Sequence, residues 1–214
     1  MSVLVLTGSS NDMKHVLEAS MPSKQQYCKE KNYNLKVITL SGKLEFERPL
    51  NLFNELKEYD FCMWLDADAI ITNKNYNIED FIAGEKPFSA SLDWTDTQTI
   101  SMGNFVIQNT QKTEELLSKY FHFCETSVHD QDAMNCVLNI SPELVNVLPR
   151  KYLNAVPSIV KKYRVGEERD IVEHWDDSCF LAHLTTISND DRINIMKNNL
   201  LFSEKSIDQQ LGMS

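Results

Sequence analysis

Basic residues, glycine, paired cysteines and long apolar runs are all scarce in this chain of 214 residues. It carries 21 Lys and Arg against 31 Asp and Glu, which leaves a formal net charge of -10. Recognition of nucleic-acid phosphates depends on clustered basic residues, so this balance argues against a nucleic-acid partner. No apolar run approaches the ~20 residues that a membrane-spanning helix needs, and we therefore expect no membrane span.

The five cysteines are odd in number, widely spaced and never in a CxxC pair. The sequence therefore encodes neither a zinc knuckle nor a thioredoxin-type redox site. Single thiols of this kind fit a reducing compartment, where they pack as small apolar side chains. The N-terminus has no basic region and no small-residue cleavage site, so it predicts a strand and not a signal peptide. We expect a soluble, cytoplasmic protein.

Strand-like and helix-like segments alternate through the first half of the chain. Three short apolar segments predict strands, at residues 3–7, 35–40 and 61–65. One helix is expected from Asn11 or Asp12 to about Asn32, with Pro22 at the first position of a second helical turn, and another begins at Pro49. This alternation predicts an α/β fold with a central, mostly parallel mixed sheet flanked by helices.

The second half is less regular. Strands are expected at residues 86–92, 104–108 and about 177–183, and helices at 113–125, from Asp130 and over 190–211. No internal repeat and no Gly/Ser linker interrupts the chain. We therefore expect one domain over 1–214, with a nucleotide-binding half (about 1–100), an acceptor and catalytic half (about 101–190) and a C-terminal helical tail (191–214).

Two carboxylates, Asp66 and Asp68, follow the strongly apolar segment at 61–65. Ligands of mostly parallel sheets bind at the carboxyl ends of the strands, so this pair and the segment 7–10 are expected at the same rim. Aspartate oxygens suit hard divalent ions such as Mg²⁺ or Mn²⁺. The pair predicts a metal site, and the alternative is a polar strand end in which one Asp caps the next segment.

Two unrelated enzyme classes use a DxD triplet of this kind. In nucleotide-sugar transferases the pair holds a metal on a diphosphate, and in haloacid-dehalogenase-type phosphatases the first Asp is a nucleophile and the second an acid/base. The phosphatase would need the triplet after its first core strand and a Gly-Asp dipeptide downstream. Two expected strands precede the triplet here, and no Gly-Asp dipeptide occurs. The pattern favours the transferase.

Three more segments accompany the triplet in a fixed order. Gly103 and Asn104 begin an apolar strand, Asp130 begins a helix, and His183 ends the last apolar segment. Together they resemble the retaining glycosyltransferases of the GT-A fold, most of all family 34, with the bacterial galactosyltransferases of family 8 a step further away. The resemblance covers about residues 1–190. The short chain without an anchor is similar to a soluble glycosyltransferase domain of a large algal virus.

The resemblance implies a role for each matching residue. Asp66 and Asp68 would bind Mn²⁺ (or Mg²⁺), with His183 as the third protein ligand. Residues expected to surround the donor nucleotide and its sugar are Thr7, Ser9, Ala67, Gly103 and Asn104. In the family a basic residue often follows the late histidine and contacts the diphosphate. No Lys or Arg closely follows His183 here, so Arg48 or the pair Lys161 and Lys162 would take that contact.

By the same resemblance, Asp130 and Gln131 match the pair under the sugar ring in the family. An oxocarbenium-like sugar needs a carboxylate or carbonyl oxygen beside it. Asp130 is the charged candidate, the Gln131 amide oxygen is the neutral one, and Asp132 is a third choice. A covalent intermediate and attack by the acceptor on the same face both remain open.

The expected activity is metal-dependent transfer of a hexose from a UDP-sugar to the hydroxyl of a glycan or glycoprotein acceptor, with retention of the anomeric configuration. One alternative is a sugar-nucleotide nucleotidyltransferase, although such enzymes carry a glycine-rich basic loop after the first strand and this chain offers one glycine there, Gly8. The other alternative is a non-catalytic carbohydrate-binding domain, which would need no metal.

Overall fold

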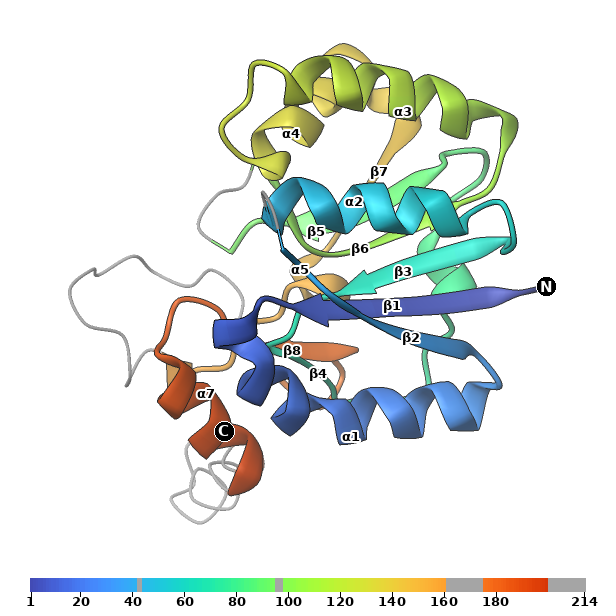
Figure 1. Cartoon of the computed structure of the whole chain (residues 1–214). Coiled ribbons are helices and arrows are strands. Elements are labelled where there is room, and N and C mark those ends of the chain that lie inside the picture. Colours follow the sequence, from blue (N-terminus) through green and yellow to red (C-terminus); the bar gives the residue numbers. More distant parts are fainter. Residues whose placement is uncertain (42–43, 95–97, 161–174, 200–214) are drawn as a thin grey trace.

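A six-stranded sheet forms the centre of the protein (Figure 1). The computed structural model describes residues 1–41, 44–94, 98–160 and 175–199. In spatial order the strands are β2 (Asn34–Thr39), β1 (Val3–Ser9), β3 (Phe61–Leu65), β6 (Ile100–Gln108), β5 (Phe88–Leu92) and β7 (Val145–Leu148). Only β6 runs against its neighbours, and the other five strands of this sheet share one direction. The expected mostly parallel mixed sheet is confirmed.

Helices cover both faces of this sheet (Figure 1). Within the described residues, the helices longer than one turn are α1 (Lys14–Lys31), α2 (Leu44–Glu55), α3 (Gln111–Cys124), α4 (Asp130–Ile140) and α7 (Asn189–Lys197). Leu4 and Leu6 of β1 pack in the cluster that includes α2, α3 and α4. Val3 and Val5 pack in the cluster that includes α1. This alternation follows from the two-residue period of a strand.

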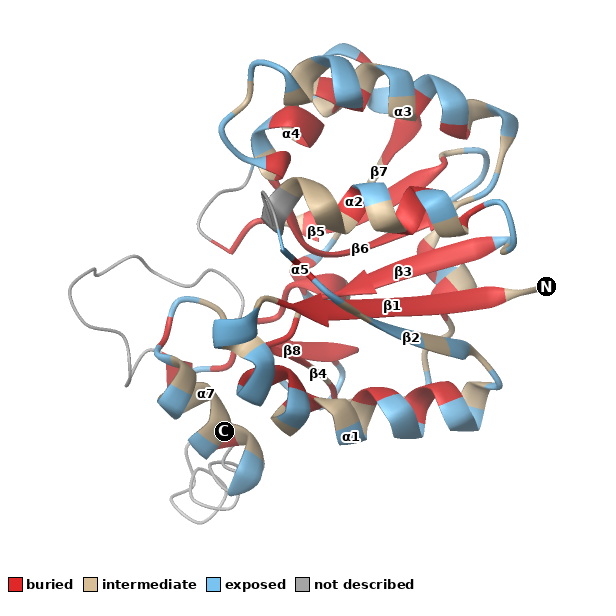
Figure 2. Ribbon diagram, in the orientation of Figure 1, coloured by how far each residue is buried: buried red, intermediate tan, exposed pale blue. Residues whose placement is uncertain are grey.

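Burial explains why the first and third strands read as continuous apolar runs. Every residue of β1 and β3 is buried, whereas the edge strand β2 is mostly exposed (Figure 2). A strand that is covered on both faces needs apolar side chains at every position. Because β1 and β3 pair in parallel, their carboxyl ends meet at one rim of the sheet, as expected.

A second, two-stranded sheet lies beside the first. It joins β4 (Ala69–Ile71) and β8 (Leu181–His183) in antiparallel register, with Ala69 opposite His183. A short helix, α5 (Arg150–Leu153), follows β7 and precedes β8 in the sequence. The pairing of β4 with β8 brings a late segment of the chain next to the residues that follow β3.

Several elements differ from the sequence prediction. Pro22 lies inside one continuous helix, α1, because the apolar face that α1 buries against the sheet outweighs the cost of an interior proline. The expected helix from Pro49 begins five residues earlier at Leu44. The strands β4 and β7 were not expected, and the last strand is only three residues long. The tail is helical over Asn189–Lys197, and residues 200–214 lie outside the described part.

None of the helices in the described ranges combines the length and the apolar composition that crossing a bilayer requires.

Candidate metal centre

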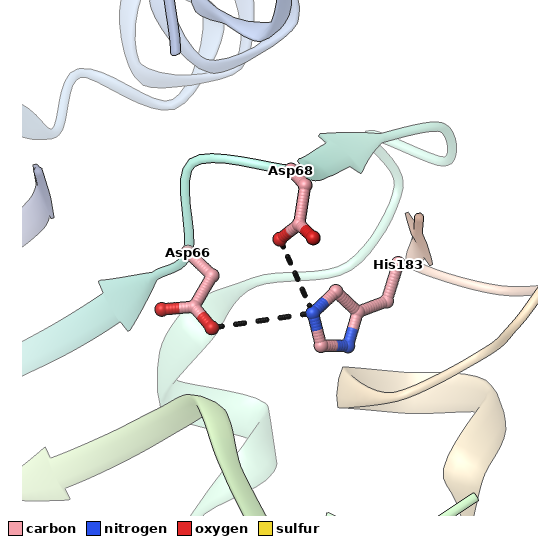
Figure 3. Close-up of side chains that lie close together, drawn as sticks. All are labelled: Asp66, Asp68 and His183. Atoms are coloured by element: carbon pink, nitrogen blue, oxygen red, sulfur yellow. Dashed lines mark ion pairs between the residues drawn. The ribbon is translucent and has the colours of Figure 1, made fainter. Parts of the chain in front are cut away.

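Three side chains with metal-binding atoms converge at the end of β3. Asp66 and Asp68 lie in the turn between β3 and β4 (the metal turn, residues 66–69). The Ala69 N–H closes this turn by donating to the Asp66 carbonyl oxygen at 3.1 Å. His183 ends β8, directly opposite Ala69. One ligand atom from each of the three residues lies within 4.8 Å of the others (Figure 3). The structure thus brings together the three residues expected to bind a metal.

One nitrogen of the imidazole faces both carboxylates (Figure 3). His183 Nε2 is 3.3 Å from Asp68 Oδ1 and 4.0 Å from Asp66 Oδ2 (Figure 3). His183 and Asp68 are almost fully buried, and Asp66 is partly exposed. Two carboxylates and one imidazole nitrogen form a donor set that suits Mn²⁺, and the carboxylates alone also suit Mg²⁺.

Asn154 fixes which nitrogen of the imidazole carries its proton. The Asn154 side-chain N–H₂ donates to the Leu92 carbonyl oxygen at 2.9 Å, so its Oδ1 faces the histidine. His183 Nδ1–H donates to that oxygen at 2.8 Å. Nε2 is left pointing at the carboxylates, in the tautomer that a metal ligand needs. No local signal in the sequence connects Asn154 with a histidine so far along the chain.

The charges of the cluster stabilise one another. Burial disfavours the charged imidazolium, but the carboxylates of Asp68 and Asp66 together outweigh this effect, so the pKa of His183 is raised. Burial also opposes the ionised form of Asp68, but His183 and Arg192 outweigh it, so the pKa of Asp68 is lowered. A proton on His183 Nε2 therefore occupies the position in which a divalent cation would bridge the same ligands.

Trp64, Gly103 and Asn104 hold the side chain and the main chain of Asp66. Trp64 Nε1–H donates to Asp66 Oδ1 at 2.7 Å, which leaves Oδ2 turned toward His183. The Asp66 N–H lies 3.1 Å from the Gly103 carbonyl oxygen and 3.1 Å from Asn104 Oδ1. Asn104 is buried, so it acts on the metal turn through the backbone of Asp66.

Gly103 lies directly against the ligand side chains. A Cβ atom at this position would come within 2.7 Å of His183 Cε1 and 3.0 Å of Asp66 Oδ2. Glycine is therefore required by the close approach of the two ligands.

Arg48 connects the metal turn to the start of α4. Its Nη1 lies 2.9 and 3.1 Å from the two carboxylate oxygens of Asp66, and its Nη2 lies 3.1 and 2.9 Å from those of Asp130. Asp130 is only 1% exposed. The structure thus brings a candidate phosphate ligand and a candidate catalytic carboxylate into one bridge with a candidate metal ligand.

The other two residues at the start of α4 are placed differently. Gln131 is half-buried, its Nε2 donates to Asp93 Oδ2 at 3.3 Å, and its Oε1 accepts from the Met102 N–H at 3.4 Å. Asp132 is exposed and accepts from the His129 N–H at 3.3 Å, which closes the capping box of α4. Asp132 therefore serves the helix terminus in this structure.

A cavity of about 310 Å³ opens at the metal turn. Its lining includes Asp66, Asp68 and His183 together with the expected Ser9, Ala67 and Arg48. Thr7 does not reach it, because its side chain is fully buried and its hydroxyl donates to the Leu65 carbonyl oxygen at 2.7 Å. A second cavity of about 210 Å³ shares Ser9 with the first and lies between α1 and β2.

Arg192 is a cavity residue that the sequence analysis missed. It comes from α7, and its Nε lies 3.1 Å from Asp68 Oδ2 and 2.8 Å from the Leu184 carbonyl oxygen. The sequence shows no base close after His183, but the turn before α7 brings Arg192 back to the cavity. Lys161 and Lys162 lie outside the described residues.

The first part of the chain matches a known enzyme family. Residues 1–93 match the sequence profile of the galactosyl transferase GMA12/MNN10 family, which is glycosyltransferase family 34. No curated protein sequence matches the chain.

Three solved structures share the fold. A glycosyltransferase involved in glycosylation of the major capsid of PBCV-1 is 16% identical, with a TM-score of 0.64 over 92% of this chain and 99% of that one. The galactosyltransferase LgtC, solved with donor and acceptor sugar analogues, is 11% identical, with a TM-score of 0.54 over 91% and 95%. Mouse xyloside xylosyltransferase 1 is 9% identical, with a TM-score of 0.52 over 86% and 97%.

The fold and the profile match together define the class of protein: the chain is a glycosyltransferase with the GT-A fold. Within that class its first 93 residues are similar to family 34, as the order of motifs in the sequence indicates.

Proposed function

We propose that this glycosyltransferase moves a hexose from a UDP-sugar to the hydroxyl of a glycan or glycoprotein acceptor, with retention, using Mn²⁺ or Mg²⁺ bound by Asp66, Asp68 and His183. The convergence of these three residues at a cavity on the carboxyl-end rim of the sheet carries the proposal. That rim is where α/β sheets bind nucleotides. The PBCV-1 and LgtC proteins, which act in capsid glycosylation and galactosyl transfer, support the same chemistry by analogy.

The metal ligands are prepared for their role by their neighbours. Trp64 and Asn154 orient the Asp66 carboxylate and the His183 ring. A divalent cation held there supplies Lewis-acid stabilisation of the charge that develops on a departing diphosphate. Oriented ligands of this kind bind a metal more tightly than freely rotating ones, because the ordering cost is met on folding.

Two guanidinium groups flank the same cavity. Arg48 and Arg192 both line it, and guanidinium binds phosphate oxygens through two parallel hydrogen bonds. In the family, a basic residue after the late histidine often contacts the diphosphate. We assign this contact to Arg192 here, with Arg48 beside it. Ser9 and Ala67 line the cavity as contacts for the nucleoside, and Thr7 supports this rim from beneath.

Stabilisation of the oxocarbenium-like sugar is assigned to Asp130 and Gln131. Arg48 holds the Asp130 carboxylate in place from the side of the metal turn. A positioned carboxylate and a neutral amide oxygen are the groups that such a transition state requires. Asp132 remains a predicted candidate for contacts with sugar hydroxyls, and Gly103 and Asn104 position the metal turn next to the sugar.

Calorimetric titration of UDP in Mn²⁺ and in EDTA tests the proposal. We expect UDP to bind in Mn²⁺ and not in EDTA, and Asp68→Ala to abolish the Mn²⁺-dependent binding. Glu58→Gln, which changes an exposed carboxylate away from the cavity, should bind UDP as the unchanged protein does. UDP binding that ignores both the metal and Asp68→Ala would contradict the metal-dependent transferase and favour a carbohydrate-binding or other nucleotide-binding role.

The single-domain organisation over 1–214, the cytoplasmic location and the viral origin remain predictions from the sequence.

A further inference from the structure

A lysine is completely buried behind the metal turn. Lys24 of α1 is 0% exposed. Burial of an ammonium group is costly, because the group loses its hydration and is usually compensated by a carboxylate. Within the described part of the chain, no carboxylate oxygen lies within 4.0 Å of Lys24 Nζ. Lys24 is therefore buried without a direct ion pair to a carboxylate among the described residues.

The hydrogen bonds of Lys24 favour its charged form. Its Nζ donates to the Asp66 carbonyl oxygen at 2.8 Å, to Ser20 Oγ at 2.9 Å and to Thr7 Oγ1 at 3.2 Å. The hydroxyl protons of Ser20 and Thr7 are committed to main-chain carbonyls at 3.0 and 2.7 Å. All three partners therefore accept, which favours the charged ammonium form. Burial lowers the pKa of Lys24 to about 7, and the nearby Asp68 and Asp66 carboxylates oppose this decrease.

The contact of Lys24 with the Asp66 carbonyl oxygen acts on the metal turn. The Asp66 carbonyl oxygen that Lys24 binds also accepts the Ala69 N–H, which closes the turn. In a straight strand, side chains two residues apart stand roughly 6.6 Å from each other. Asp66 and Asp68 both approach His183 Nε2 only because the chain turns between them.

We propose that Lys24 is a positioning residue for the metal centre: its ammonium group holds the Asp66 carbonyl and with it the turn that brings both aspartates to His183. Lys24 ties this turn to two other elements, because Ser20 belongs to α1 and Thr7 to β1. The proposal rests on the metal site of the proposed function.

If Lys24 positions the metal turn, its replacement should weaken metal binding, whereas simple electrostatics predicts tighter binding. Loss of a positive charge near two carboxylates raises their attraction for a divalent cation, so a purely electrostatic role would give tighter metal binding. Loss of the hydrogen bond to the Asp66 carbonyl misplaces a ligand and weakens binding. The two mechanisms therefore differ in the sign of the effect, and we expect weaker binding.

The test is a Mn²⁺ titration, followed by electron paramagnetic resonance, of Lys24→Met and the unchanged protein. Methionine keeps an unbranched side chain of similar length but has neither the charge nor the donors. We expect at least tenfold weaker Mn²⁺ binding. The control Leu116→Ala removes a fully buried side chain in the cluster on the other face of the sheet and lowers stability without touching the turn. It should bind Mn²⁺ within twofold of the unchanged protein.

A second measurement needs no metal. The Trp64 indole N–H donates to Asp66 Oδ1, so its nuclear magnetic resonance signal reports the position of the metal turn. We expect Lys24→Met to shift this signal and Leu116→Ala to leave it in place, with Trp64→Phe providing the assignment. If the unchanged protein binds no Mn²⁺, the proposed function fails. The indole signal would then still test whether Lys24 positions the metal turn.

Equal or tighter Mn²⁺ binding by Lys24→Met, with an unmoved indole signal, would overturn the proposal. If Lys24→Met does not fold, Lys24→Gln takes its place in both measurements. Glutamine is uncharged and shorter but retains an N–H donor, and we expect the same direction of change with a smaller size. An unchanged Mn²⁺ affinity and indole signal in Lys24→Gln would overturn the proposal as well.

Discussion

Asn154 Oδ1 lies 2.8 Å from His183 Nδ1 and thereby directs the other ring nitrogen toward Asp68 and Asp66. Asn154 is itself only 1% exposed, and its side-chain N–H₂ is committed to the Leu92 carbonyl oxygen. The orientation of the imidazole is therefore built into the folded protein before any metal arrives. In metal sites, such outer partners commonly change affinity by about 10–100-fold when they are lost.

Asn154→Ala should therefore weaken Mn²⁺ binding by about 10–100-fold, because the ring loses the partner that selects its tautomer. Isothermal titration of Mn²⁺ measures this loss. Asn146→Ala provides the control, since Asn146 is a partly buried amide that also donates to a main-chain carbonyl, that of Phe81, but belongs to β7. Equal affinities in the two variants would show that Asn154 does not orient His183.

Arg48→Ala should destabilise the protein, because the guanidinium is then removed from both the Asp66 and Asp130 carboxylates. Loss of one partner from a buried ion pair typically costs about 3–5 kcal/mol of the free energy of unfolding. Urea unfolding of Arg48→Ala, Asp130→Asn and the double variant measures the coupling between the two residues. A double variant whose loss equals the sum of the single losses would show that the bridge contributes no coupling energy.

The pH dependence of metal binding should follow His183. Its pKa is raised, so the imidazole keeps its proton to a higher pH than an ordinary histidine, and Mn²⁺ must displace that proton. Mn²⁺ affinity should accordingly rise as the pH increases from 6 to 9. Titrations across this range in the unchanged protein and in His15→Asn, which changes an exposed histidine, should give the same slope. A flat profile would contradict the role of His183 as a ligand.

The same shift affects stability without metal. Because the folded pKa of His183 lies above its unfolded value, its charged form stabilises the protein below the unfolded pKa, and this contribution is lost as the pH rises through the folded pKa. The lowered pKa of Asp68 acts at the other end of the range, and its contribution is lost as the pH falls through the folded value. Thermal unfolding in EDTA over the same pH range should show the decline above neutrality.

The features that lie within one chain segment could be predicted from the sequence. Asp66 and Asp68 follow a strand that is apolar at every position, and this pattern indicates both the buried strand and the rim at which it ends. How far along the strand the cavity reaches could not be predicted, because Thr7 and Ser9 face the same side of β1. Thr7 and Ser9 both end β1, but only Ser9 lines the cavity.

The rest of the site depends on contacts between distant segments. His183 joins the aspartates through the pairing of β4 with β8, and β4 is too short to give a periodic signal. Arg192 reaches Asp68 through the packing of α7, and nothing near it in the sequence marks an active-site residue. Lys24 resembles the other lysines of a polar helix, and only its burial in the folded protein distinguishes it.

The pairing of β4 with β8 has a consequence for folding. Asp68 and His183 are separated by more than half of the chain, and a cation bound to both would act as a reversible cross-link across that long loop. Cross-links that close long loops reduce the entropy of the unfolded chain most, and a ligand that binds only the folded state shifts the folding equilibrium with its concentration. A metal ion bound for catalysis would thus also hold the segment that carries His183 to the turn that carries Asp68.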